Sequence, residues 1–389
     1  ARSALERIMG NATEQAAIVE VLEPIYEADQ NFGGLVDLLQ VKLSLEDSRP
    51  ERAAILQRVA EISEKHLDDK VRALDAVGLW LAEDPTSEHA LADLDRLAAE
   101  LGRHAEIVAR LQGIADNSED SVVRERMCLL RGRILLEALS DPVGAEQAFL
   151  GALAADPENL DALAALDGIY RRENNAESLS TIAWRLGEVK FDAAEKVAHF
   201  AEAARLREEP LGDRAGAIEV WKKVLELEEG NGEAHERLIR LYEKGQAWPE
   251  LHETLALAAR FAEGPEREAA YRRRAAQVLA TKLGDFDGAA QAWMQVANLA
   301  PNDEDALVML AQAHRQRKDY DGVKDAMERH LTIVDDLARK VSIYFELAGL
   351  AENERNQPDE AVALYDNILD LDAGNIAAYE ALEQALAKA

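Results

Sequence analysis

The sequence predicts an all-α protein built as a solenoid, in which helical hairpins stack side by side. Six leucines recur every 72 residues, and five alanines repeat at the same interval without an insertion or deletion. The leucines are Leu22, Leu94, Leu166, Leu238, Leu310 and Leu382, and the alanines are Ala73, Ala145, Ala217, Ala289 and Ala361. A regular period of this length indicates repeated units that bury their apolar faces against one another.

The composition agrees with a helical repeat protein and limits its partners. Hydrophobic residues make up 48% of the 389 residues but aromatic residues only 5%, which is typical of helices that meet through small side chains. The chain has 75 acidic and 44 basic residues, so its net charge is −31. We expect no nucleic-acid partner, since this charge repels phosphate backbones. We also expect no membrane insertion, since no run approaches about 18 apolar residues.

Each period divides into two hairpins of about 36 residues, because apolar residues recur at spacings of three and four. Residues 1–15 read as a partial unit, residues 16–375 as about ten hairpins, and residues 376–389 as a final unpaired helix. We therefore expect one domain, 1–389, cut from a longer array and open at both ends. Within the first hairpin, Pro24 should kink the predicted helix "IVEVLEPIYEAD" or remove one of its hydrogen bonds.

The later hairpins carry recognisable start and stop signals. Asp141 and Pro142 place a capping carboxylate before a proline at the first helical position, and Gln357-Pro358 repeats that proline. Gly212 and Gly284 supply the turn conformations between helices. Prolines then end three of the second helices, at Pro85, Pro157 and Pro301.

Two hairpins show the side-chain pattern in full. In residues 232–264, Leu238, Leu241 and Tyr242 lie on one face of the first helix, and "GQ" turns the chain into "WPELHETLALAARF". In residues 269–303, a small residue, an aromatic, an aliphatic and a terminating proline follow in order, as Ala289, Trp293, Val296 and Pro301. This pattern resembles the tetratricopeptide repeat (TPR) family over essentially the whole chain.

The resemblance implies a right-handed superhelix of about ten TPR-like hairpins, with the exposed side of each first helix lining a concave partner-binding groove. Two features depart from the family. The hairpins that carry the ladder alanines are expected to have one extra residue in their first helix. Large residues stand where the family favours a small one, which predicts wider helix separation in every second hairpin; these are Leu35, Ile107, Leu179, Leu251 and Val323.

Arginines recur on the predicted groove side of the first helices. At about 100° per residue, positions two and five residues from the ladder leucine point away from the core. The arginines at these and corresponding positions are Arg96, Arg133, Arg171, Arg205, Arg240, Arg273 and Arg315. A line of arginines favours an acidic partner segment, because the guanidinium fork matches a carboxylate. The alternative is pairing within a helix, as in Arg133–Glu137, Arg205–Glu209 and Arg240–Glu236.

No motif points to catalysis, a metal or a cofactor. The eight histidines lack metal-ligand spacing, and Cys128 reads as a small core residue. Core packing is also the better reading of the tryptophans. We predict a non-enzymatic scaffold that binds an extended peptide or a helix in its groove; the alternative is a structural spacer or self-assembly module that associates through its open ends. A single cysteine favours the cytoplasm.

Overall fold

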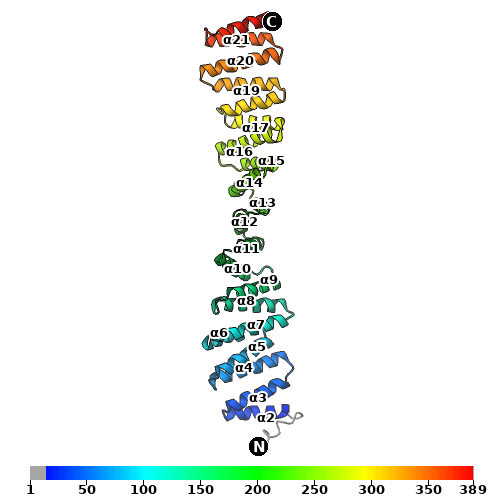
Figure 1. The fold of residues 1–389 in the computed structure, drawn as a ribbon. Helices are drawn as coiled ribbons and strands as arrows, with labels where there is room; N and C mark the ends of the chain where they lie inside the picture. The colour runs from blue at the N-terminus through cyan, green and yellow to red at the C-terminus, as the bar shows by residue number, and fades with distance from the viewer. Residues whose placement is uncertain (1–14, 389) are drawn as a thin grey trace. The chain divides into compact units, whose positions relative to one another are not determined.

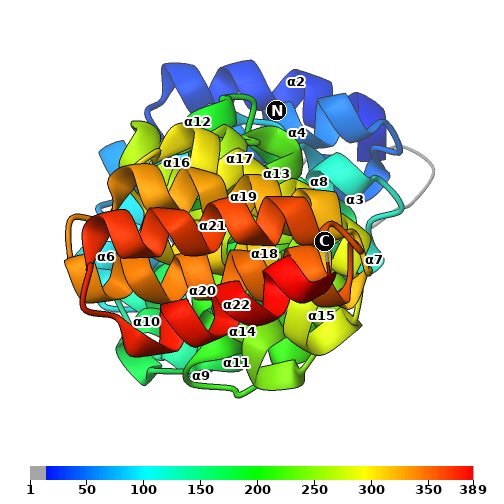
Figure 2. The same cartoon turned by 90° about the horizontal axis from the view of Figure 1, so that it is seen from above.

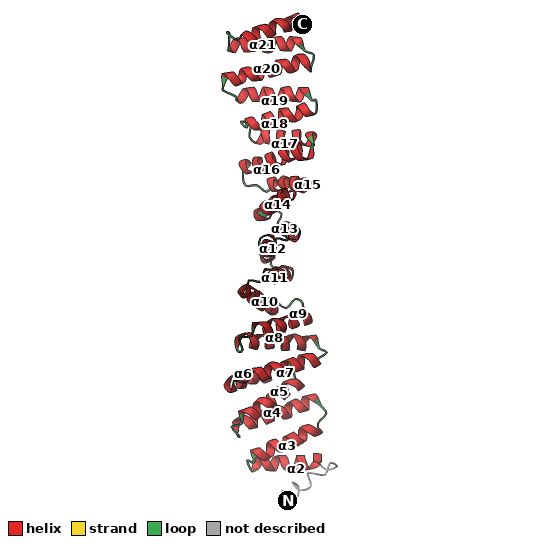
Figure 3. Ribbon diagram, viewed as in Figure 1, coloured by secondary structure: helices red, strands yellow, loops and turns green. Residues whose placement is uncertain are grey.

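The computed structural model describes residues 15–388, and no strand occurs among them. They form 21 α-helices, and within each of two units consecutive helices pack side by side (Figures 1 and 3). The all-α solenoid prediction is confirmed. The predicted partial unit at residues 1–15 lies outside the described residues, apart from Gln15, which begins the first described helix.

The helices divide into two compact units, each described here by itself. The unit that runs to Phe191 contains α2 (Gln15–Ala28), α3 (Phe32–Leu45), α4 (Arg49–Lys65), α5 (Lys70–Glu83), α6 (Glu88–Leu101), α7 (His104–Asn117), α8 (Ser121–Glu137), α9 (Pro142–Ala155), α10 (Leu160–Glu173) and α11 (Ala176–Val189). Pro24 lies inside α2, which continues past it. That residues 1–389 act as one domain stays a prediction.

The unit that begins at Asp192 contains the remaining helices. They are α12 (Ala193–Glu208), α13 (Arg214–Leu227), α14 (Gly232–Gly245), α15 (Trp248–Arg260), α16 (Pro265–Val278), the π-helix η1 (Leu279–Leu283), α17 (Phe286–Leu299), α18 (Glu304–Gln316), α19 (Tyr320–Ile333), α20 (Leu337–Asn353), α21 (Pro358–Leu371) and α22 (Ile376–Lys388). Figure 2 shows α20, α21 and α22 side by side at the C-terminal end.

Even-numbered helices are the first helices of hairpins, and odd-numbered helices are the second helices. The leucine hairpins, such as α6–α7, carry a ladder leucine on the first helix, whereas the alanine hairpins, such as α8–α9, carry a ladder alanine on the second. First helices of leucine hairpins begin at residues 88, 160, 232, 304 and 376. Second helices of alanine hairpins begin at 70, 142, 214, 286 and 358. The 72-residue period of the sequence is therefore also the period of the helices.

The turns within hairpins follow the same period. Residues with positive φ end the first helices in two registers: Gln30, Gly102, Asn174, Gln246 and Lys318 in leucine hairpins, and Asp68, Ser140, Gly212, Gly284 and Asn356 in alanine hairpins. In alanine hairpins the next N–H donates to a carbonyl six residues earlier, as from Asp141 to Leu135 at 2.8 Å. This bond spans one residue more than the Schellman bond, which the leucine hairpins form, as from the Asn175 N–H to the Tyr170 carbonyl at 3.0 Å.

The ladder residues lie in the core. All five ladder alanines are 0% exposed, and the first five ladder leucines are at most 2% exposed, whereas Leu382 is half-buried. Trp80, Trp221 and Trp293 are buried, which confirms their core reading. Trp248 is half-buried, with the Lys282 ammonium 4.9 Å from its ring centroid.

The first helices of alanine hairpins differ from the sequence prediction. One extra residue was predicted, but α4, α8 and α20 each have 17 residues, against 14 in α6, α10 and α14. The helix continues because apolar residues near its end, such as Ile134 and Leu135 in α8, stay buried. After α16 the extension takes the form of η1, a π-helix of 5 residues.

Candidate partner-binding surfaces

All seven predicted arginines are exposed and lie on first helices. Arg96, Arg171, Arg240 and Arg315 belong to leucine hairpins, on α6, α10, α14 and α18. Arg133, Arg205 and Arg273 belong to alanine hairpins, on α8, α12 and α16. The sequence thus placed them on the correct class of helix, and what distinguishes them is their hydrogen-bond partners.

Two of these arginines join neighbouring first helices through paired hydrogen bonds. Arg96 of α6 donates to both carboxylate oxygens of Glu64 on α4, at 2.5 and 2.9 Å. Arg205 of α12 does the same to Glu233 of α14, at 2.7 and 2.5 Å. The pairing raises the pKa of Arg205 and lowers that of Glu233. Both guanidinium groups therefore already form a strong, bidentate ion pair with a carboxylate of this chain.

Three more arginines each pair with a carboxylate. Arg273 of α16 donates to Asp303 at 2.6 Å, and Arg315 of α18 donates to Glu346 at 2.8 Å. Arg171 donates to Asp167, four residues earlier in α10, at 2.7 Å. Five of the seven arginines therefore carry charges that a carboxylate of this chain offsets.

The alternative pairing within helices also differs from the structure. Arg205 does not bond Glu209, four residues on, because Arg237 of α14 donates to that carboxylate at 2.7 Å. This hydrogen bond lowers the pKa of Glu209. For Arg205, a carboxylate of a neighbouring first helix thus takes the place of one in the same helix, whereas Arg171 pairs within α10 and Arg96 also pairs with Asp93 within α6.

Arg133 and Arg240 stand apart, since neither forms an ion pair with any residue in the described range 15–388. The positive charge of Arg240 helps to lower the pKa of Glu209 without a direct bond. Arg133 lines a groove of about 530 Å³ between α6 and α8. Of the seven arginines, Arg133 is therefore the one best placed to pair with a carboxylate of another protein.

The α6–α8 groove combines an apolar lining with charged groups. Leu91 of α6 and Leu129, Leu130 and Ile134 of α8 line it, together with Arg126, Glu88, Asp95, Glu137 and His104. Arg126 is occupied, because it donates to Glu88 at 2.5 Å and to the carbonyl oxygen of Thr86 at 3.0 Å. An apolar side chain with a nearby carboxylate suits this arrangement of leucines and Arg133.

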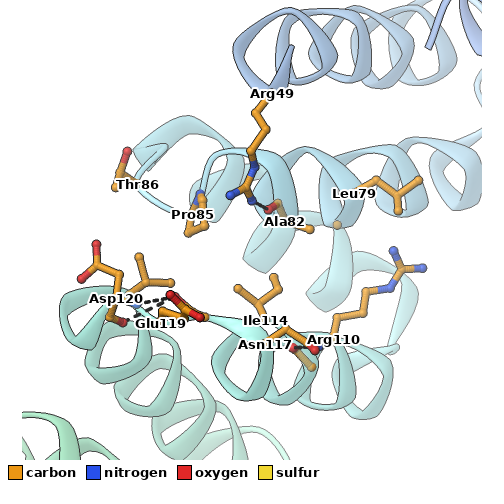
Figure 4. A pocket seen from close by; sticks show the side chains of 14 residues that line it. Arg49, Leu79, Ala82, Pro85, Thr86, Arg110, Ile114, Asn117, Glu119 and Asp120 are labelled. Carbon is orange, nitrogen blue, oxygen red and sulfur yellow. Dashed lines mark hydrogen bonds between the residues drawn. The ribbon is translucent and has the colours of Figure 1, made fainter. Parts of the chain in front are cut away.

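A larger cleft, of about 790 Å³, lies on the second-helix side between α5 and α7. Figure 4 shows Leu79, Ala82 and Pro85 on one side of it and Ile114 and Asn117 on the other. No prediction made from the sequence corresponds to this cleft. The signal that could have found it is a glycine, Gly113, at a register where other periods carry larger side chains.

The structure adds little that points to chemistry. Among residues 15–388, no three His, Cys, Asp or Glu side chains gather as a metal site. Cys128 is 8% exposed and burial raises the pKa of its thiol, in agreement with a core role. No helix in the same range is long and apolar enough to span a membrane.

Comparisons with known proteins bear on the fold. No protein-family model and no curated protein matches the sequence. Among solved structures, YrrB, described as a TPR protein with an unusual peptide-binding site, is 17% identical over 52% of this chain and 97% of its own, with a TM-score of 0.30. The C-terminal part of a TPR protein from Cytophaga hutchinsonii is 14% identical over 65% of this chain and 99% of its own (TM-score 0.32). Yeast Tom70 is 16% identical over 100% and 91% of the two chains (TM-score 0.26).

This chain folds as a TPR-like α-solenoid. Because the TM-scores are low, that statement stands on the chain's own helices, which alternate as hairpins and repeat every 72 residues. In a TPR-like solenoid each hairpin contacts its neighbours and leaves long helix faces exposed.

Proposed function

We propose that this chain is a protein-interaction scaffold that holds an extended or helical segment of another protein against its first helices. The α6–α8 groove anchors the segment. The observation that carries the proposal is the placement of Arg133, unpaired within the described residues, beside Leu91, Leu129 and Leu130 in that groove. Apolar anchors give affinity and a charged group fixes orientation, as in helix-in-groove recognition.

The partner segment that matches this groove has an acidic residue at one position and an apolar residue close to it. A carboxylate one helical turn from a leucine would meet Arg133 while the leucine enters the groove. The net charge of −31 opposes the approach of any acidic segment. Binding should therefore strengthen when moderate salt screens the long-range repulsion but leaves the short Arg133 contact.

The test compares Arg133→Gln with Arg205→Gln, which removes the same charge from an arginine that Glu233 occupies. The probes are synthetic helical peptides of about 15 residues with a glutamate one turn from a leucine pair, measured by fluorescence polarisation. We expect Arg133→Gln to weaken binding about tenfold or more, the size of one charged hydrogen bond. Arg205→Gln should bind like the wild type. Equal affinity in all three proteins would refute the proposal.

A second candidate function is self-association through α22. Tyr379 and Leu386 are 54% and 58% exposed, whereas Leu307 and Tyr242, which lie whole periods before them, are 2% and 4% exposed. Among residues 15–388, this face of α22 is exposed, whereas the equivalent residues of earlier leucine hairpins are buried. An apolar face of this kind fits the same face of a second copy.

Light scattering over a concentration series tests this second candidate. We expect the wild type to gain mass with concentration and Tyr379→Lys/Leu386→Lys to remain monomeric. Val308→Lys is the control, because Val308 is 43% exposed on α18, where Leu307 and Leu310 beside it are buried. A wild type that stays monomeric throughout would exclude self-association.

A further inference from the structure

Two registers carry glycine at the α5–α7 cleft, and the first of them, Gly113, leaves open space there. At the register of Gly113 the other periods have Val41, Arg185, Leu257 and Arg329. A Cβ added at Gly113 would meet no atom within 4 Å. The cleft therefore has free space where other periods place a side chain.

The second glycine lets an arginine line the cleft. At the register of Gly78 the other periods have Leu150, Lys222, Met294 and Asp366. A Cβ at Gly78 would lie 2.4 Å from Nη1 of Arg110, so the Arg110 side chain packs directly against α5 at this glycine. It reaches α5 and donates to the backbone carbonyl of Asp75 at 3.2 Å while pairing with its carboxylate.

The same chain shows which side chain fills this space elsewhere. In the hairpins of α17 and α19, Arg329 donates to the carbonyl oxygen of Ala297 at 3.1 Å and to the side-chain oxygen of Asn298 at 3.3 Å. In α11, Arg185 donates to the carbonyl oxygen of Pro157 at 3.3 Å. Arginine at this register thus satisfies carbonyls at the end of the preceding second helix, where helices leave acceptors unpaired.

The charges around the α5–α7 cleft suit a further guanidinium. Arg49 is occupied, since it donates to the Ala82 carbonyl at 2.7 Å and pairs with Glu83 at 3.5 Å. Arg110 is offset by Asp75. The carboxylate of Glu119, which lines the cleft, forms no ion pair within residues 15–388 and is exposed. An added arginine would therefore gain a carboxylate partner without displacing one.

We propose that the α5–α7 cleft receives an arginine side chain of a partner protein, which takes the place that Arg329 and Arg185 hold in their own periods. The guanidinium donates to carbonyls at the end of α5 and pairs with Glu119. This site lies on second helices and is independent of the Arg133 groove. A basic segment also gains from long-range attraction to a chain of charge −31.

The experiment fills the cleft with a side chain of the protein itself. Gly113→Arg should reproduce the Arg329 arrangement and exclude an incoming side chain. Because a half-buried helical glycine with open space around it is replaced by a good helix former, we also expect this variant to melt no lower than the wild type. The matched control is Gly168→Arg, in which a glycine of α10 with no atom within 4 Å of an added Cβ receives the same residue.

The probes are an array of 12-residue peptides that each contain one arginine, with counterparts in which citrulline, uncharged and of nearly the same shape, replaces it. We expect the best wild-type binder to lose about tenfold in affinity with citrulline. Gly113→Arg and Glu119→Gln should each remove that preference, whereas Gly168→Arg and Arg133→Gln retain it. Either no arginine preference in the wild type or a preference that survives in folded Gly113→Arg would overturn the proposal.

Discussion

At the scale of single residues, the period shows which side chains depart from their equivalents. His235 of α14 is 2% exposed and lies at the register of Leu163 and Leu307, both buried leucines. Its Nε2 lies 2.8 Å from the carbonyl oxygen of Glu229, and its buried Nδ1 has no partner. Burial lowers the pKa of His235 from its ordinary value of 6.5. Burial in the folded protein therefore favours the neutral form of this imidazole.

A neutral buried histidine makes stability depend on pH. Because the folded pKa lies below the unfolded one, protonation favours unfolding, and stability falls as the pH drops below about 6.5. We expect urea unfolding to show a smaller loss between about pH 7.5 and about pH 5.5 in His235→Leu than in the wild type. Measurements stay in this range because Glu209, whose pKa Arg237 lowers, contributes only at more acidic pH. An unchanged pH dependence would contradict the assignment.

At the scale of helices, the N-caps of the second helices in alanine hairpins follow the period with one exception, that of α21. In alanine hairpins, Asp69, Asp141, Asp213 and Asp285 each accept a hydrogen bond from the backbone N–H three residues later. The fifth equivalent, Gln357, makes no such bond, although its backbone has a similar conformation. The first turn of α21 thus lacks an interaction that its four equivalents have.

Gln357→Asp should supply the missing cap. The carboxylate would accept from the N–H of Glu360 and lie at the positive end of the helix dipole, for a gain of about 0.5–1 kcal/mol. Thermal unfolding measures it, with Asp213→Ala as the reciprocal variant that should lose about 1 kcal/mol. No gain in Gln357→Asp together with a loss in Asp213→Ala would show that the α21 terminus is built differently.

The helices were largely predictable from the sequence, but their ends and contacts were less so. The ladders, the helix-ending prolines and the cap at Asp141 each depend on residues a few positions apart, so local patterns reveal them. The length of α8 depends on burial of Ile134 and Leu135 against neighbours, which a local pattern does not show. The partner of Arg205 is 28 residues away, on another helix, so its occupation by Glu233 required the structure.

At the scale of the whole chain, electrostatics sets a balance between repulsion and pairing. The excess of 31 negative charges destabilises the compact state through self-repulsion. Exposed pairs such as Arg315–Glu346 contribute only about 0–1 kcal/mol each. Screening should therefore relieve more repulsion than it removes attraction.

We expect the melting temperature to rise as NaCl increases from about 10 to about 300 mM, the range in which the Debye length shortens from about 30 Å to below 8 Å. Circular dichroism at 222 nm measures the transition. Repeating the series with sodium perchlorate and sodium sulfate separates screening from specific anion effects. A melting temperature that falls in NaCl would mean that the ion pairs between first helices outweigh the repulsion.

The shared register of the N-caps has a consequence for how such a gene changes. Removing residues 214–285 would join Asp213 to Phe286. Asp213 would then cap the helix that Asp285 caps now, because Gly288 would follow it by three residues, as Gly216 does in the present chain. The new junction, Asp213 followed by Phe286, has the same two residue types as the Asp285–Phe286 junction that the chain already contains. A single in-frame crossover could thus shorten or lengthen this protein by whole modules, and related genes should differ by multiples of one module rather than by arbitrary lengths.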